Sequence, residues 1–238
     1  MEMKDPIYEP KGRAAEYADL ALNLYTGCTN GCTYCYAPGV LRRSREDFAG
    51  DVVPRKGILE ALEHQLMSGE FAGKTVHLCF TCDPFPRGVD PQVTCDAIRL
   101  LKQAGANVQL LTKNPSIAAL SCSILLDGND SVGTSITGAP EWMEPQAESA
   151  ELRLRALEVF RSLGIGTWAS CEPIIDPEPI YDLIETCDFI DLYKFGKLNY
   201  AQSDLDWAQV GRRIEELCEE HGRDYLIKSS LREEMDGR

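Results

Sequence analysis

Short apolar runs recur along the chain, and each is followed by a longer stretch in which apolar residues return every three to four positions. The runs predict strands at residues 20–25, 75–80, 107–111, 131–136, 165–170 and 189–194, with 225–228 as a candidate seventh. The longer stretches predict helices at residues 54–68, 91–105, 115–126, 148–163, 178–186 and 206–221. Strands and helices therefore alternate along most of the chain.

This alternation is typical of consecutive βαβ units and a parallel sheet. About six units fall short of the eight that close a TIM barrel of roughly 250 residues, so we expect an α/β fold with a partial (β/α)6, TIM-like barrel in a single domain. The periodicity leaves a doubly wound sheet open as the alternative. Residues 1–18 are rich in charge and proline and are expected to form a lead-in with little core, and residues 19–238 to form the barrel domain.

Composition narrows the class of protein. The 238 residues are 44% hydrophobic and 26% charged, which is ordinary globular composition. No apolar run approaches the ~20 residues of a membrane span, and the first residues lack the apolar region of a signal peptide, so we expect a cytoplasmic protein with no membrane partner. The formal net charge of −14 repels phosphate over the whole molecule, so a nucleic-acid partner would need a local basic patch.

Three cysteines stand within eight residues directly after the first predicted strand, as Cys28, Cys32 and Cys35 with the spacing C-x3-C-x2-C. Three thiolates in so tight a loop can bind three irons of an iron–sulfur cluster. Structural zinc needs four ligands, and the next histidines after the loop are His64 and His77. A cluster held in this way leaves one iron open to a molecule from outside the chain. The other seven of the ten cysteines are scattered and are expected to be mostly small buried residues.

Polar residues follow every predicted strand, at the end where sites lie in parallel α/β folds. After the Cys loop, these tips are residues 80–85, 112–114, 135–137, 170–173 and 194–200. Each tip carries polar or charged groups next to a glycine or a proline. We expect the tips to surround one site. Glu172 at the fifth tip is a candidate cofactor or substrate ligand, with an ordinary loop acid as the alternative.

The motif around the cysteines, N-x-Y-x-G-C-x-x-G-C-x-Y-C-Y-A, is followed by T-x-D after the second predicted strand and L-T-K after the third. In this order the motifs resemble the radical S-adenosylmethionine (SAM) superfamily, and more narrowly its spore photoproduct lyase-like branch, over about residues 20–200. The resemblance implies a partial barrel that binds a [4Fe-4S] cluster and SAM. It also implies reductive cleavage of SAM to a 5′-deoxyadenosyl radical, which abstracts hydrogen from a substrate.

The resemblance also implies roles for individual residues. Cys28, Cys32 and Cys35 would ligate three irons, and SAM would chelate the fourth. The SAM contacts would come from Tyr34, Thr81, Asp83, Lys113 and Ser135, with Glu172 as a candidate for the amino group. Lysine suits the SAM carboxylate, and an acidic residue can accept from ribose hydroxyls.

The catalytic candidates are Tyr34, Tyr36 and Cys82. The two tyrosines match a pair that is implicated in hydrogen transfer in the lyase. The lyase has a hydrogen-donating cysteine where this chain has Phe80, and Cys82 is the nearby thiol that we name as the candidate. The candidate substrate wall is Phe80, Lys194, Lys197, Asn199 and Tyr200.

The partners that these assignments imply are an electron donor such as flavodoxin or ferredoxin and a substrate. We expect the substrate to be a nucleobase in DNA or RNA, such as a DNA photoproduct. Modification of a peptide or small metabolite is the alternative within the same chemistry. A non-catalytic iron–sulfur electron carrier or sensor is the alternative from another class of protein, although such a protein normally ligates every iron itself.

Overall fold

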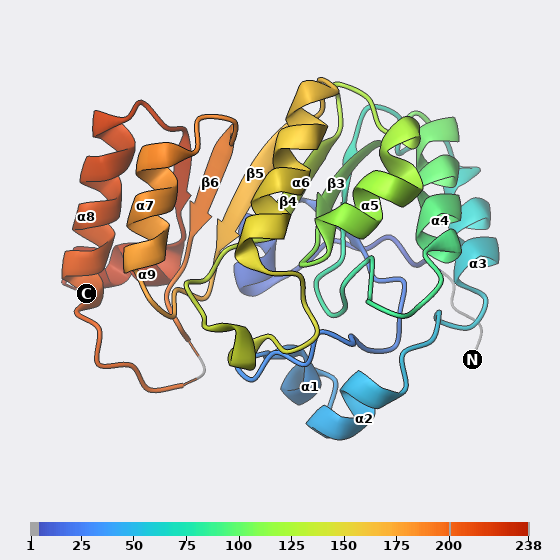
Figure 1. Cartoon of the computed structure of the whole chain (residues 1–238). Coiled ribbons are helices and arrows are strands. Elements are labelled where there is room, and N and C mark those ends of the chain that lie inside the picture. Colours follow the sequence, from blue (N-terminus) through green and yellow to red (C-terminus); the bar gives the residue numbers. More distant parts are fainter. Residues whose placement is uncertain (1–4, 200, 238) are drawn as a thin grey trace.

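The computed structural model describes residues 5–199 and 201–237 and forms one curled sheet of parallel strands in these ranges (Figure 1). The strands are β1 (Leu20–Leu22), β2 (Thr75–Leu78), β3 (Asn107–Leu111), β4 (Ser131–Ser135), β5 (Gly166–Cys171), β6 (Leu192–Phe195) and β7 (Tyr225–Ile227). Their order in the sheet follows the chain from β1 to β7 without a reversal. A doubly wound sheet reverses its order at a switch point, so the predicted partial barrel is confirmed and that alternative is excluded.

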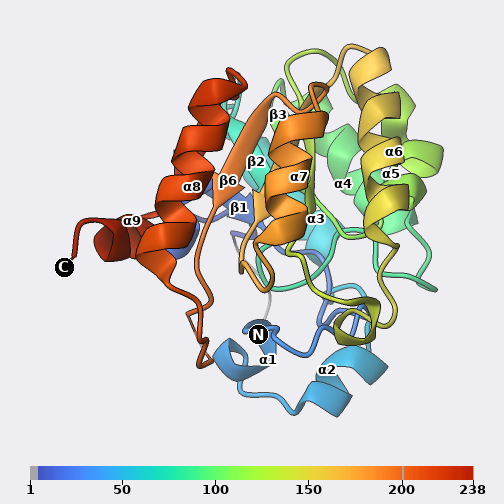
Figure 2. The same ribbon diagram turned by 60° about the vertical axis from the view of Figure 1, so that its left-hand side comes forward.

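Helices cover the outer face of the sheet, and the views in Figures 1 and 2 agree on this arrangement. They are α3 (Ile58–Leu66), α4 (Gln92–Gln103), α5 (Pro115–Cys122), α6 (Ala150–Ser162), α7 (Glu178–Thr186) and α8 (Trp207–Glu220). The short helices α1 (Ala37–Val40) and α2 (Arg45–Gly50) lie beyond the carboxyl ends of the strands (Figure 1). The Cys loop therefore lies at the end of the barrel where a site is expected.

Alternate residues of each strand face the helices and the barrel interior. Val76 and Leu78 of β2 are fully buried in the main core, whereas His77 between them contacts Gln109 of β3. The rings of His77 and Trp168 lie 6.1 Å apart, although β2 and β5 are not neighbours in the sheet. Only a curled sheet brings these strands so close, and its interior carries polar residues such as His77.

Several boundaries differ from the prediction, for local reasons. The helix predicted from residue 54 begins at Ile58, because Pro54 pairs with Tyr25 and Gly57 adopts a left-handed conformation with φ of 69°. The sixth strand is Leu192–Phe195 rather than residues 189–194, and the candidate seventh strand is present as β7. The hydrophobic pattern does not predict α1, α2, α9 (Ser229–Met235) or the 3-10 helices η1 (Gly12–Glu16), η2 (Ser123–Leu125) and η3 (Glu141–Met143).

Residues 5–18 pack on the barrel more closely than the sequence predicts. Ile7 is buried in the main core, and its backbone N–H donates to Gln65 Oε1 at 2.8 Å. Tyr8 pairs with Ala21 of β1 in an antiparallel bridge, and Tyr17 enters the mouth of the barrel. The lead-in segment therefore contributes to the core and to the pocket.

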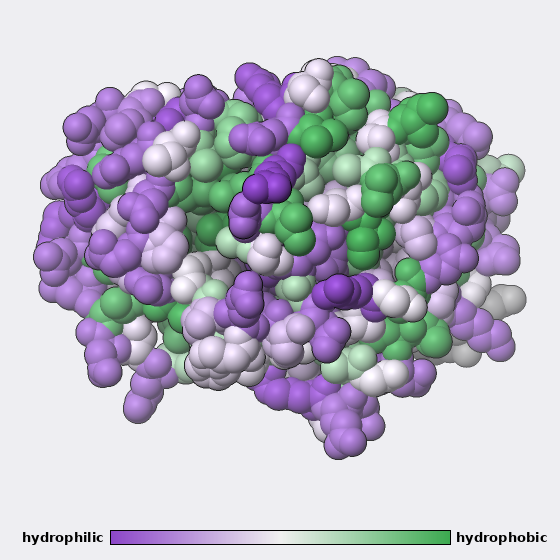
Figure 3. All heavy atoms as spheres, in the orientation of Figure 1, coloured by the Kyte–Doolittle hydropathy of each residue, from purple (hydrophilic) through white to green (hydrophobic). Residues whose placement is uncertain are grey.

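The outer helices expose some apolar side chains, which gather over α5 and α6 in Figure 3. Leu120 and Ile124 are about nine-tenths exposed, and Val159 and Leu163 about half exposed. Among the described residues, no helix is long and apolar enough to cross a membrane.

Candidate functional site

The carboxyl ends of the strands border a pocket of about 610 Å3, which the Cys loop and residues of the lead-in segment also line. The predicted site residues on its wall are Cys28, Cys32, Tyr34, Cys35, Tyr36, Phe80, Thr81, Cys82, Asp83, Lys113, Ser135, Glu172, Lys197 and Asn199. Lys194 does not lie on this wall, and Tyr200 is outside the described residues. Side chains that are up to about 170 residues apart in the sequence therefore meet at one site.

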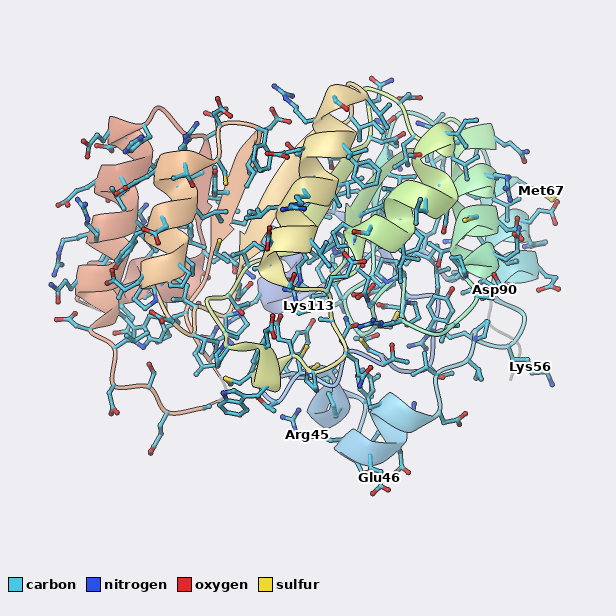
Figure 4. All side chains as sticks on the ribbon, viewed as in Figure 1. Arg45, Glu46, Lys56, Met67, Asp90 and Lys113 are labelled. Carbon is cyan, nitrogen blue, oxygen red and sulfur yellow. The ribbon has the colours of Figure 1, made fainter. Side chains whose placement is uncertain are left out.

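The Cys loop presents three free, half-buried thiols to the pocket. Two residues of α2 hold the backbone of the loop. Cys28 N–H donates to the Phe48 carbonyl at 3.1 Å, and Arg45 Nη1 donates to the Cys32 carbonyl at 3.1 Å (Figure 4 labels Arg45). Gly27 is required here, because a Cβ would lie 2.1 Å from the Phe48 carbonyl oxygen. Burial raises the pKa of Cys32 to about 11, so this thiol keeps its proton until a metal displaces it.

These three thiols fit a cluster better than a single ion. Within residues 5–199 and 201–237, no three or more His, Cys, Asp or Glu side chains are placed to hold one metal ion. In a [4Fe-4S] cluster each thiolate binds a different iron, so the ligands are spread over the face of the cluster. The Oγ1 atom of Thr81, on the same pocket wall, is buried and has no hydrogen-bond partner among the described residues, so it can receive a group of a bound cofactor.

Asp83 ties the Cys loop to the tips of β2 and β3. Its Oδ2 accepts from Asn30 Nδ2 at 2.8 Å and from Lys113 N–H at 2.9 Å. Its Oδ1 accepts from Thr112 Oγ1 at 2.6 Å and from Phe85 N–H at 2.8 Å. The predicted ribose contact of Asp83 stays a prediction, but here the carboxylate has four donors already and its evident effect is to hold the loops together.

Lys113 follows the end of β3, and its side chain reaches Tyr34 in the Cys loop. Its Nζ donates to Tyr34 Oη at 2.9 Å and to Glu144 Oε1 at 2.8 Å. Burial lowers the pKa of Lys113, but Tyr34 and Glu144 outweigh burial and hold that pKa above its usual value. Ser135 at the tip of β4 is linked to the same region, because its carbonyl accepts from Arg153 Nη1 at 2.8 Å. Two of the predicted SAM contacts, Lys113 and Ser135, are therefore linked through Glu144 and Arg153.

Glu172 lies across the pocket in a second polar group. Its Oε2 accepts from Lys228 Nζ at 2.8 Å and from Tyr17 Oη at 2.8 Å, and the same Tyr17 Oη lies 2.8 Å from Ser170 Oγ. Lys228 is 2% exposed and Glu172 17% exposed in their side chains. Glu172 thus lines the pocket as predicted, but as the partner of a buried lysine that the sequence did not single out.

Lys194 lies in the barrel interior instead of at the substrate mouth. The residue is 4% exposed, its Nζ donates to the Tyr17 carbonyl at 3.2 Å, and it lies 4.7 Å from the ring centre of Trp168. Burial and the nearby Lys228 lower the pKa of Lys194 to about 8. The prediction that Lys194 lines the mouth is wrong, because the Lys194 side chain points into the interior of the curled sheet and Tyr17 covers the Lys194 ammonium group.

The other predicted wall residues are held by neighbours. Tyr36 Oη donates to the Phe80 carbonyl at 2.7 Å, and the Phe80 ring stacks on His77 with centres 4.2 Å apart. Lys197 forms an ion pair with Glu234. Asn199 Nδ2 donates to the Lys197 carbonyl at 3.0 Å. These contacts place the residues on the wall without assigning them a ligand.

Cys79 and Cys82 both line the pocket, Cys79 as a buried residue and Cys82 as a half-buried one. Burial raises the pKa of Cys79 well above its usual value. Burial acts in the same direction on Cys82, but the hydrogen bonds with Cys79 and with the backbone of Leu24 and Tyr25 outweigh it and lower the pKa of Cys82. Cys82 is the more exposed residue of the pair and the one whose pKa is lowered, and both features favour reactivity.

The chain belongs to the radical SAM superfamily, whose family model matches residues 22–190. Members of this superfamily are enzymes that typically bind an iron–sulfur cluster and SAM. An uncharacterized protein of Methanocaldococcus jannaschii is 26% identical over 212 residues, which cover 85% of this chain and 78% of that protein. An uncharacterized protein of Mycobacterium tuberculosis is 23% identical over 173 residues, which cover 65% of this chain and 49% of that protein. The chain thus spans about half the length of the mycobacterial relative.

Solved structures share the fold at low sequence identity. Spore photoproduct lyase with bound AdoMet and dinucleoside spore photoproduct has a TM-score of 0.61 and 17% identity, covering 89% of this chain and 63% of that chain. SuiB of Streptococcus suis bound to its precursor peptide SuiA has a TM-score of 0.62 and 13% identity, covering 91% and 51%. At these identities the likeness concerns the fold, and it does not distinguish a nucleotide substrate from a peptide.

Proposed function

We propose that this protein reductively cleaves SAM at a [4Fe-4S] cluster and abstracts hydrogen from a substrate. The observation that carries the proposal is the convergence of Cys28, Cys32 and Cys35 with Lys113 and Ser135 on one pocket wall. When bound, the cluster and SAM would supply a 5′-deoxyadenosyl radical. A reductant such as flavodoxin or ferredoxin would provide the electron.

The residues on the wall have the chemistry to orient SAM. Lys113 carries a buried positive charge suited to the SAM carboxylate. The Thr81 hydroxyl, which bonds to none of the described residues, can form a hydrogen bond with the cofactor. The ring of Tyr34 lies 5.4 Å from Lys113 Nζ and offers a face beside the Cys loop. The pocket walls would shield a radical from solvent, which is the task of the protein in cofactor-dependent chemistry.

We propose a nucleobase-containing substrate such as a DNA photoproduct, in a lyase-like reaction. Tyr34 and Tyr36 support it, since both lie on the pocket wall as a pair beside the last ligand of the Cys loop. A peptide or small metabolite is the second candidate, favoured by the net charge of −14. The substrate would meet Phe80, Lys197 and Asn199 on the pocket wall.

Anaerobic reconstitution with iron and sulfide, followed by dithionite and SAM, tests the chemistry. We expect 5′-deoxyadenosine and methionine, and we expect neither from Cys32→Ala. Reversible reduction of the cluster without 5′-deoxyadenosine would instead support an electron carrier or sensor. A UV-irradiated dinucleotide and an intact tRNA, compared side by side, test the substrate class, and SAM cleavage without a coupled product from either would count against a nucleobase.

A further inference from the structure

A single segment, residues 137–148, crosses the Cys loop on its way from β4 to α6, and we call it the strap. Thr33 N–H in the Cys loop donates to the Met143 carbonyl of the strap at 2.9 Å. Glu148 N–H at the other end of the strap donates to the Lys113 carbonyl at 3.2 Å. The strap is therefore attached both to the loop that carries the proposed cluster ligands and to the backbone of Lys113, the proposed SAM ligand.

Glu144 in the strap is the link to the charged side chains. It is 7% exposed, its Oε1 accepts from Lys113 Nζ at 2.8 Å and from Tyr34 Oη, and its Oε2 accepts from Arg153. Thr137 Oγ1 also lies 3.4 Å from Oε1. Burial opposes ionisation, but Lys113 and Arg153 outweigh it and lower the pKa of Glu144 to about 2.

This group contains two buried cations and one buried carboxylate. The side chains of Lys113, Arg153 and Glu144 are 13%, 4% and 7% exposed, so water screens them little. A buried group with one positive charge in excess is costly unless an anion completes it. Lys113 is the member that lines the pocket, and its ammonium group has a third N–H beyond those bonded to Glu144 and Tyr34.

We propose that Glu144 is a positioning residue that holds Lys113 in place for the amino-acid end of SAM, an inference that rests on the proposed function. Without its carboxylate, Lys113 and Arg153 are two like charges in a buried space and repel each other. Lys113 then leaves the position from which its third N–H reaches the pocket. Arg153 holds the second carboxylate oxygen of Glu144, Oε2, so this oxygen does not compete with SAM for the third N–H of Lys113.

Binding of two ligands to the reconstituted, unreduced protein separates positioning from general damage. SAM carries the amino-acid end, whereas 5′-methylthioadenosine lacks it and keeps the nucleoside. In titration calorimetry under anaerobic conditions, we expect Glu144→Gln to weaken the binding of SAM about tenfold or more, because a charge-assisted hydrogen bond to the SAM carboxylate is lost. The affinity for 5′-methylthioadenosine should stay within about twofold of the wild type. Glu144→Asp should recover part of the SAM affinity. Glu141→Gln, an exposed acid of the same strap, should change neither ligand.

Unchanged SAM binding in Glu144→Gln, or equal weakening of both ligands, would overturn the inference. If the Gln variant does not fold, the Asp variant carries the same test, with selective loss of SAM affinity as the supporting result. Failure of the wild-type protein to bind SAM would instead overturn the proposed function, so the two failures are distinguishable.

Discussion

Replacing Asp83 by asparagine tests whether the Cys loop is held in place by a buried carboxylate. Asp83 is 5% exposed and accepts four hydrogen bonds, two on each oxygen. An asparagine of the same shape keeps one acceptor oxygen and turns an NH2 group towards the two donors on the other side. Two bonds to a charged group are lost, and each is worth roughly 1.5–3 kcal/mol.

We therefore expect Asp83→Asn to lower the free energy of unfolding by about 3 kcal/mol, after some relaxation of the two opposed donors. For a chain of this length, 1 kcal/mol shifts the unfolding midpoint by about 2–4 °C, so the midpoint should fall by about 6–12 °C. Since Asn30 lies between Cys28 and Cys32 and bonds to Asp83, the variant should also take up less iron.

The assay is thermal unfolding of the cluster-free protein by circular dichroism, together with iron and sulfide content after anaerobic reconstitution. Asp90→Asn is the matched control, because Asp90 is exposed and accepts from Gln92 N–H at 3.0 Å in a loop away from Lys113 (Figure 4). An Asp83→Asn protein with the midpoint and iron content of the wild type would show that the Asp83 carboxylate does not hold the Cys loop in place.

Three further outcomes follow from the pocket. Lys228→Met should lower the free energy of unfolding by about 3 kcal/mol, because it leaves Glu172 without its buried partner. Lys197→Met should lower it by about 1 kcal/mol or less, because the Lys197–Glu234 pair is more exposed, and equal losses in denaturant unfolding would contradict this. Lys194→Met should stabilise the protein by about 3 kcal/mol at pH 7, because each unit by which burial lowers the pKa of Lys194 costs the charged form about 1.4 kcal/mol. The folded-state pKa of Lys194, about 8, lies below its unfolded value, so the advantage should shrink as pH rises from about 8 to about 10.4; a constant advantage would disprove this cause. Iodoacetamide at pH 7.5 should label Cys82 before Cys79 in peptide mass spectrometry, and the reverse order would contradict the lowered pKa of Cys82.

The sequence predicts the fold well because alternating strands and helices leave a local, periodic signal. The order of the strands needed the structure, since a doubly wound sheet has the same periodicity. The Cys loop was also predictable, because its three ligands are close in the sequence. Helix boundaries were wrong where a tertiary contact intervened, as at Pro54, which pairs with Tyr25.

The partners of the site residues were not predictable, because they come from distant parts of the chain. Glu144 meets Tyr34 across 110 positions, and Tyr17 meets Glu172 across 155 positions. Nothing in the local sequence marks Glu144 among the other acids of its loop. Lys194 was misplaced for a related reason, since the curl of the sheet decides which residues of β6 turn inward.

The most direct test of the central claim is production of 5′-deoxyadenosine from SAM by the reconstituted, dithionite-reduced protein, measured by liquid chromatography and mass spectrometry. We predict one cluster per chain by iron content and 5′-deoxyadenosine that depends on both reductant and Cys32. A protein that binds a full cluster and SAM but forms no 5′-deoxyadenosine under reduction would contradict the account.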